Sequence, residues 1–210
     1  SSASTALLST AGALVAVTGF SRGGIVAGTP YGVEASGVRP ATAAEFNNPD
    51  AYVLSDGAGN NRYPVRAGTD GAEVASPLTA AEVRAVLEEA FKVMSRSRAQ
   101  IRRPLDSRGE VSISVVDTRG VALGLVRAPD APIFGIDVSL QKARTSAFFS
   151  GSRVAAELGA VTTAIGEPDA NVRDFVIRLS SFFGPANGAF DGRFAVSNRA
   201  VGLVARPYFP

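Results

Sequence analysis

The sequence predicts an α+β fold, in which helices flank a mainly antiparallel sheet and a β-rich extension precedes it. Three patterns support this class: a strand–turn–strand run over residues 111–127, an amphipathic helix after Thr79, and short apolar runs between turn signals in residues 1–75. With 210 residues, of which 46% are hydrophobic, the chain is large enough to bury a core.

Residues 1–75 are expected to form the β-rich extension, or the end of a preceding module. Apolar runs at 14–18 and 24–28 predict two strands around a turn. Residues 51–54 lie between two turn signals and predict another short strand. The stretch 66–77 has the composition of a linker and marks the predicted domain boundary.

The second predicted domain, residues 76–210, opens with a helix. Thr79 and Glu82 form a capping box, in which each side chain accepts from the other residue's amide. The helix is expected to end near Ser97. Its apolar face consists of Val83, Val86, Leu87, Ala90, Phe91 and Met94.

A β-hairpin is predicted next. Alternation over residues 111–115 places Ser112 and Ser114 on the face opposite the apolar side chains. Residues 117–120 suit a type I turn with Gly120 at positive φ, and residues 121–127 form the return strand.

Two more helices and a strand are expected after the hairpin. The first helix covers residues 140–149, with Asp137 or Ser139 as its cap. The second helix covers residues 172–183, and the strand covers residues 200–204.

The composition excludes several classes of function. The 21 basic and 19 acidic residues leave a net charge of only +2, too small an excess for a non-specific nucleic-acid binder. No apolar run approaches the roughly 20 residues of a membrane-spanning helix. The chain has no cysteine and no histidine, so we predict no catalytic residue and no metal site.

Residues 19–23 (Gly-Phe-Ser-Arg-Gly) match the nucleophile-elbow pattern of serine hydrolases. A catalytic Ser21 would need a base, which is ordinarily a histidine. A strand pattern also follows where the elbow requires a helix. A hairpin loop is therefore favoured, and a hydrolase using Ser21 is kept as a second alternative.

Arginines are concentrated at the predicted end of the first helix. They form either an anion site or a solvated helix end with ion pairs, and the latter is favoured. The residues are Arg96, Arg98, Arg102, Arg103 and Arg108.

The combination Val115-Val116-Asp117-x-x-Gly120, Arg127-x-x-Asp130-Ala131 and Lys142-Ala143-x-Thr145 resembles the GlcG/HbpS haem-binding-protein family. The match lies mainly in residues 78–150. The resemblance implies a compact α+β domain, a tendency to form homo-oligomers, and haem or another tetrapyrrole as the cofactor. Family domains usually finish with a glycine-rich strand pair, which is not found before Pro210.

The resemblance also suggests which residues meet the ligand. Arg127, Lys142 and Arg144 would face ligand carboxylates, or would only brace the loop at residues 128–132 through salt bridges. Without histidine, the conceivable axial ligands of haem iron are tyrosines and Met94. Tyr63 is the preferred one because arginines flank it. The tyrosines are Tyr31, Tyr52, Tyr63 and Tyr208.

The sequence therefore predicts a non-catalytic, haem-binding-like domain. Its expected partners are further copies of the chain or other segments of a longer precursor. Similar domains in long secreted bacterial proteins suggest a secreted, periplasmic or envelope location. The first alternative is a structural or interaction module that kept the fold and lost the ligand. The extension could also supply part of the sheet that the missing strand pair leaves open.

Overall fold

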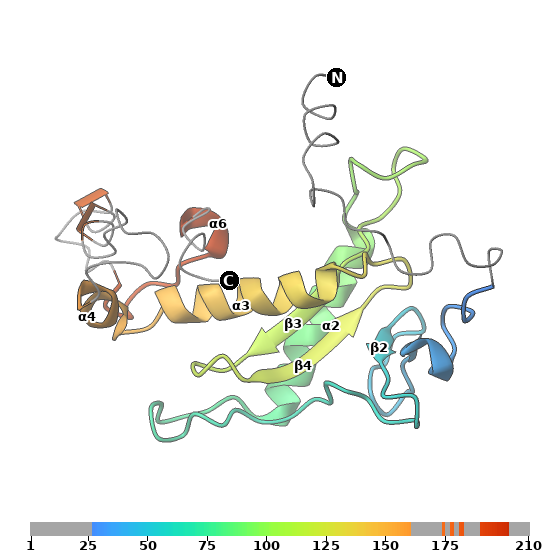
Figure 1. Ribbon diagram of the computed structural model, residues 1–210, viewed down its shortest axis with the longest axis horizontal. Helices are drawn as coiled ribbons and strands as arrows, with labels where there is room; N and C mark the ends of the chain where they lie inside the picture. Colours follow the sequence, from blue (N-terminus) through green and yellow to red (C-terminus); the bar gives the residue numbers. More distant parts are fainter. Residues whose placement is uncertain (1–26, 161–173, 175–176, 179–180, 183–189, 202–210) are drawn as a thin grey trace, which may run out of the picture. The chain divides into compact units, whose positions relative to one another are not determined.

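The computed structural model describes residues 27–160, 174, 177–178, 181–182 and 190–201 (Figure 1). The chain divides into two units, Ser1–Pro30 and Tyr31–Pro210. The predicted strands at 14–18 and 24–28 lie outside the described residues, apart from residues 27 and 28, which are not in a strand. The account that follows concerns the second unit.

An antiparallel sheet of four strands forms the centre of this unit. In chain order the strands are β1 (Val38–Pro40), β2 (Tyr52–Leu54), β3 (Ser112–Val116) and β4 (Ala122–Arg127), and in space they lie in the order β1-β2-β4-β3. The predicted α+β class and the hairpin are confirmed. Gly120 in the turn has a φ of 75°, as the turn pattern requires.

Helix α2 (Ala80–Arg96) covers one face of the sheet, and the predicted capping box at Thr79 is present. Its buried side chains join those of β2 and β4 in the main core, together with Ile113 and Val115 from β3. Gly124 permits close contact here, because a Cβ at this position would lie 2.8 Å from Leu87 Cδ1.

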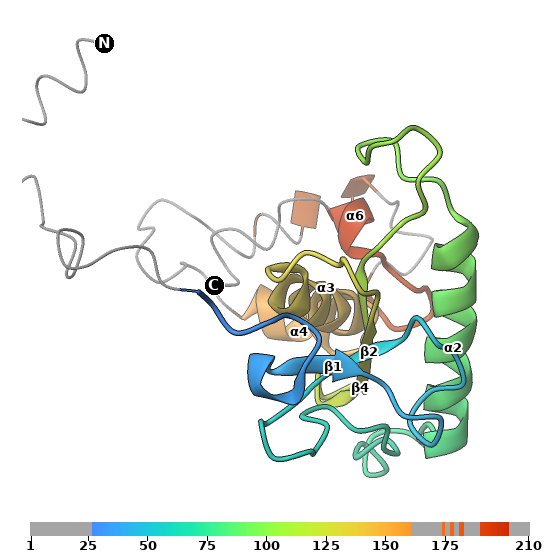
Figure 2. The ribbon, with the colours of Figure 1, turned by 90° about the vertical axis from the view of Figure 1, so that its right-hand side faces the viewer.

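Helix α3 (Gly135–Phe149) lies on the other side of the strands from α2, as Figure 2 shows, and packs mainly on β3. Leu140 of α3 packs in a second cluster with Leu125, Val38 and Leu54. Successive side chains of the hairpin strands therefore point alternately toward α2 and toward α3, which lie on opposite faces of the sheet.

The start of α3 corrects the sequence prediction. The helix begins at Gly135, its N-cap is Phe134, and no side chain caps it. Neither Asp137 nor Ser139 is the cap, because the backbone already turns at Pro132, whose carbonyl accepts from Gly135 N at 3.0 Å. Tertiary packing and this turn start the helix without a capping side chain.

The remaining elements are short. They are η1 (Glu34–Ser36), α4 (Val154–Gly159) and α6 (Asn198–Val201). The predicted strand at 200–204 is wrong for residues 200 and 201, which are helical, and its other residues lie outside the described part. Of the predicted helix at 172–183, residues 174, 177, 178, 181 and 182 are described, and all are helical.

Strands from the first 75 residues complete the sheet, since β2 pairs with β4 through Tyr52 and Arg127. The predicted boundary at residue 75 thus falls within one compact unit. Residues 66–77 lack regular structure, yet Arg66 N donates to Leu123 O of β4 at 2.9 Å. The other expectation for residues 1–75 is that they supply part of the sheet. Strands β1 and β2 agree with it.

Candidate functional site

Arg127 is the last residue of β4 and is fully buried, with 0% of its surface exposed. Its register partners are Ser112 on β3 and Tyr52 on β2. Directly opposite residues of antiparallel strands point to the same face. The three side chains therefore form a row across the sheet, on the side that α3 covers.

Most of the Arg127 guanidinium has no hydrogen-bond partner among the described residues. Nη2 donates to the carbonyl of Ala131, whereas Nε and Nη1 are buried and donate to no described group. The hydroxyl of Ser112 is also buried without a described partner. Buried donors of this kind are uncommon in proteins, and a buried cation is the costliest case.

Tyr31 lies over this guanidinium. The centroid of its ring is 5.8 Å from Arg127 Cζ, and the ring stacks on Tyr52 at 6.2 Å. The Tyr31 hydroxyl donates to Pro129 O at 2.5 Å, and half of the residue's surface remains exposed. Burial raises the pKa of Tyr31, and the neighbouring Arg127 charge lowers it in part.

The nearest acids are engaged by other arginines. Asp130 pairs with Arg102, and Glu110 pairs with Arg108 at 3.1 Å. Among the residues that the structure describes, no carboxylate lies within ion-pair distance of Arg127. A cationic group is thus held in the interior beside acids that are already neutralised.

The loop at residues 128–132 is braced, as one interpretation of the sequence expected, but not by an Arg127–carboxylate pair. Arg127 binds the Ala131 carbonyl, Tyr31 binds Pro129, and Arg102 Nη2 donates to Asp130 O at 2.7 Å. The carboxylate of Asp130, the acid in this loop, is paired with Arg102 and not with Arg127.

Lys142 and Arg144 do not join Arg127. Both are exposed on α3, and Arg144 Nε donates to Gly120 O at 2.9 Å, in the hairpin turn. Gly120 lies in the turn before β4 and Arg127 is the last residue of that strand, so they are about 20 Å apart at the usual rise per strand residue. The predicted set of three cations around one ligand is not assembled.

Tyr63 belongs to the cluster of apolar side chains between the sheet and α3. It is half-buried, and this α3-side cluster also includes Tyr52, the strand partner of Arg127. Met94 is buried in the other cluster, on the α2 side, and is a core residue. The donor set on the α3 side fits a ligand carboxylate at Arg127, and Tyr52 and Tyr63 lie on the same side of the sheet.

The favoured interpretation of the arginine cluster is supported for three of its members. Arg98 pairs with Asp106 at 3.3 Å, Arg102 pairs with Asp130, and Arg108 pairs with Asp50 at 2.6 Å. Arg96 and Arg103 are exposed. These arginines fix the loop after α2 to its neighbours.

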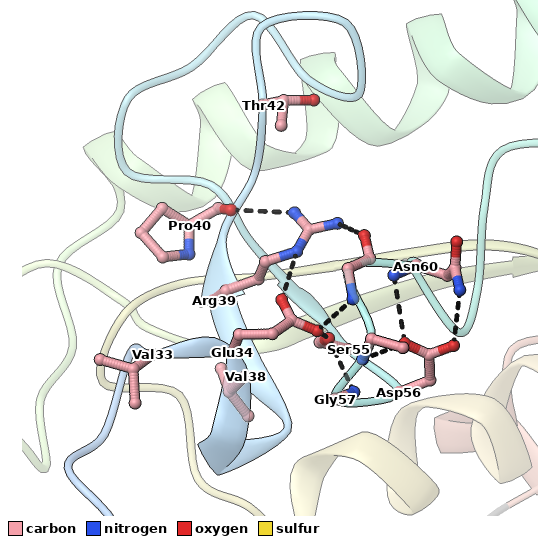
Figure 3. Close-up of polar contacts among 12 residues, drawn as sticks. Val33, Glu34, Val38, Arg39, Pro40, Thr42, Ser55, Asp56, Gly57 and Asn60 are labelled. Atoms are coloured by element: carbon pink, nitrogen blue, oxygen red, sulfur yellow. Dashed lines mark hydrogen bonds and ion pairs between the residues drawn. The ribbon is translucent and has the colours of Figure 1, made fainter.

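A dense polar network surrounds Arg39 of β1 (Figure 3). Its guanidinium contacts Glu34 at 3.2 Å and Glu45 at 2.8 Å, and also donates to Gly59 O at 3.0 Å. The hydrogen bond from Arg39 is the main reason that the pKa of Glu45 is lowered to about 2. Because the opposite charges meet within the network, it ties β1 to the loop after β2 and leaves no spare cation for a ligand.

A cavity of about 300 Å³ lies beside the junction of α3 and α4. Its charged residues are paired with one another: Arg119 with Glu73 at 2.8 Å, and Arg153 with Glu157 at 3.4 Å. Within the described residues, no cluster of three or more acidic, histidine or cysteine side chains is placed to hold a metal. Ser21, the nucleophile of the hydrolase alternative, lies outside the described residues.

Sequence reasoning did not place Ser112 or Tyr31 beside Arg127. Strand alternation put Ser112 on the polar face, which is the available signal for it. Tyr31 lies 96 positions before Arg127 in the sequence and belongs to no regular element. Its position over the guanidinium follows only from the tertiary fold.

No helix among the described residues has both the length and the apolar character needed to cross a bilayer. Comparisons with protein-family models, with curated proteins and with solved structures find no match. Among the described residues, Arg127 combines full burial with side-chain nitrogens that have no hydrogen-bond partner.

Proposed function

We propose that this chain is a non-catalytic binding domain for a carboxylate-bearing ligand, with haem or a related tetrapyrrole as the candidate class. The observation that carries the proposal is Arg127, which is fully buried, with Nε and Nη1 unpaired among the described groups. The resemblance to GlcG/HbpS-like proteins supplies the tetrapyrrole class, and the propionates of such a ligand are carboxylates.

The energetic argument concerns the cost of a buried charge. Moving an unpaired guanidinium from water into a protein interior costs several kcal/mol, even after relaxation. A carboxylate that accepts from Nε or Nη1 would offset this cost through charge-assisted hydrogen bonds. Part of the free energy of ligand binding would then come from pairing a buried charge that is unpaired in the ligand-free protein.

The geometry favours one carboxylate contact rather than several. Arg144 lies at the far end of the hairpin from Arg127, and Lys142 is exposed on α3. When bound, haem would supply an iron centre, and Tyr63 is the residue that we propose as its ligand. In this proposal Lys142 and Arg144 do not contact the ligand.

A haem titration followed by the Soret band tests the proposal. The unmodified chain should shift the band with a saturable, one-to-one stoichiometry. Arg127→Met should weaken binding at least tenfold, whereas Arg144→Met, a matched change at an exposed arginine, should leave it unchanged. An unshifted Soret band would refute the tetrapyrrole assignment, and equal weakening in both variants would refute the role of Arg127.

A second candidate is an interaction module, and exposed apolar side chains favour it. Ile101 and Leu105 lie in the loop after α2 and are 96% and 64% exposed, and Phe134 before α3 is 73% exposed. Exposed apolar groups of this kind are typical of protein contacts. We propose a further copy of the chain, or another segment of the same precursor, as the partner, in a secreted or envelope location.

Light scattering of the purified chain tests this candidate. A stable oligomer that becomes monomeric in the double variant Ile101→Ser, Leu105→Ser would support it. A monomeric chain at all accessible concentrations would contradict self-association.

A further inference from the structure

We infer that Arg127 and Ser112 form a binding site for a single carboxylate group beside the start of α3, and that the side chain of Tyr31 covers this site. The inference rests on the proposed function because both use Arg127. It goes further by naming the donor set, the chemical class of the smallest sufficient ligand and the residue that controls entry.

The first argument is the supply of donors. Nε of Arg127 carries one N–H and Nη1 carries two, and none of these has a described acceptor. Ser112 is directly opposite Arg127 in the β3–β4 register, so the Cβ atoms are expected to be about 5 Å apart. The Ser112 hydroxyl, also buried without a described partner, is available to the same ligand.

The second argument is the position of α3. A Cβ at Gly135, the first residue of this helix, would lie 3.8 Å from Ser112 Oγ. The amino terminus of a 15-residue helix therefore starts beside the serine. Helix amino termini carry partial positive charge and favour anions. Asp137 in the first turn reduces this potential, and the amides of Gly135, Ile136 and Val138 already donate to backbone carbonyls. The helix start therefore adds a weak field beside Ser112, and the donors come from Ser112 and the arginine.

The third argument concerns the side chain of Tyr31, which covers the site. The Tyr31 ring lies over a fully buried guanidinium while half of the residue is exposed. It is held by stacking on Tyr52 and by one hydrogen bond to Pro129 O. Tyr31 is also the first residue of the compact unit, directly after the division at Pro30. Because Tyr31 belongs to no helix or strand, we expect its side chain to rotate away from Arg127 without breaking the pairing of the strands.

The fourth argument concerns selectivity. One guanidinium balances one negative charge, and its planar donors match a carboxylate. The neighbouring arginines, Arg102 and Arg108, are already paired with acids. A phosphate dianion would therefore keep one of its two charges uncompensated at this site. A monocarboxylate is consequently the expected ligand class, as a free acid or as the side arm of a larger molecule.

Calorimetric titration with sodium propionate, at constant ionic strength, tests the inference on the whole chain. One propionate should bind per chain, and inorganic phosphate should not compete. Arg127→Met should reduce affinity at least tenfold, Ser112→Ala should reduce it several-fold, and Arg144→Met should leave it unchanged. Tyr31→Ala should accelerate propionate association in stopped-flow measurements, because the cover is removed.

The outcomes separate this inference from the proposed function. Propionate binding without haem binding would support the carboxylate site and refute only the tetrapyrrole class. Haem binding without propionate binding would overturn the present inference, as would equal propionate affinity in Arg127→Met and the unmodified chain. If Arg127→Met does not fold, unchanged affinity in Ser112→Ala would overturn the donor set by itself.

Discussion

Asp70 holds Thr118 at two points: its Oδ2 atom accepts from the Thr118 amide at 2.9 Å and from the Thr118 hydroxyl at 2.7 Å. The arrangement is reciprocal, since Asp117 accepts from the amide and hydroxyl of Thr69 at 3.0 Å and 2.7 Å. We call these four residues the Asp–Thr clasp. The clasp joins the irregular segment 66–77 to the hairpin turn.

The clasp makes stability sensitive to acid. The pKa of Asp70 is lowered by its hydrogen bonds from Thr118, and that of Asp117 is lowered because the bonds it accepts outweigh the effect of burial. A carboxyl with a lowered folded-state pKa contributes stability above its unfolded pKa, near 4, and this stability is lost as pH falls through the folded value.

Asp70→Asn should therefore lower the free energy of unfolding at pH 7 by about 1.5–3 kcal/mol, the range for hydrogen bonds to a charged group. Urea denaturation at pH 7 and at steps below pH 4 measures the effect. The difference between the variant and the unmodified chain should shrink as the solution is acidified. A difference that is constant with pH would contradict the role of the Asp70 charge.

Glu45 should behave similarly at lower pH. Its carboxylate accepts from both terminal nitrogens of Arg39, at 2.8 Å and 3.0 Å, and from the Thr42 amide at 2.8 Å. Because its pKa is lowered to about 2, its contribution is expected to persist to more acidic solution than that of an ordinary glutamate. Glu45→Gln should cost about 1.5–3 kcal/mol at pH 7.

Glu89→Gln is the matched control for Glu45→Gln. Glu89 pairs with Lys92, and both side chains are largely exposed, so its loss should change unfolding free energy by less than about 0.5 kcal/mol. If both glutamine substitutions lowered the free energy of unfolding equally, the Arg39 network would stabilise the protein no more than an exposed ion pair does.

Gly124→Ala should destabilise the unit by about 1–3 kcal/mol through overpacking. The new methyl group would lie 2.8 Å from Leu87 Cδ1 and 3.6 Å from Val83 Cγ1, between β4 and α2. Gly159→Ala, where nothing lies within 4 Å of the added Cβ, should be close to neutral. Thermal unfolding of both variants provides the comparison, and a neutral Gly124→Ala would contradict the tight contact.

Arg127→Met should make the ligand-free chain more stable, by about 1–2 kcal/mol. The substitution removes an uncompensated buried cation and keeps much of its volume, and such changes are often stabilising. The Ala131 carbonyl loses its donor, which limits the gain. Urea denaturation without added carboxylates tests this, and a large loss of stability would argue that Arg127 is a purely structural residue.

The elements that local pattern determines were predictable from sequence. The Thr79 capping box and the positive φ of Gly120 depend on neighbouring residues, and the structure contains both. The start of α3 was missed because a backbone turn at Pro132, rather than a capping side chain, begins the helix.

The candidate site was predictable only in part. Arg127 was identified from the motif, but the arrangement around it depends on residues far apart in sequence. Tyr31 reaches it across 96 positions, and the acid beside it, Asp130, is taken by Arg102. Lys142 and Arg144 belong to the same motif, yet the length of the hairpin separates Arg144 from Arg127. Residues that lie close together in the sequence motif therefore do not all converge on one site in the fold.

The pairing of β2 with β4 has a consequence for the order in which the unit folds. Tyr52 and Arg127 are register partners although they lie 75 positions apart in the sequence, whereas β3 and β4 are joined by a tight turn. Because closing a long loop is slower than forming a local hairpin, the β3–β4 pair is expected to assemble first. The burial of Arg127 is then expected to be completed only after β2 has joined β4. We therefore expect the cost of burying its charge to arise late in folding.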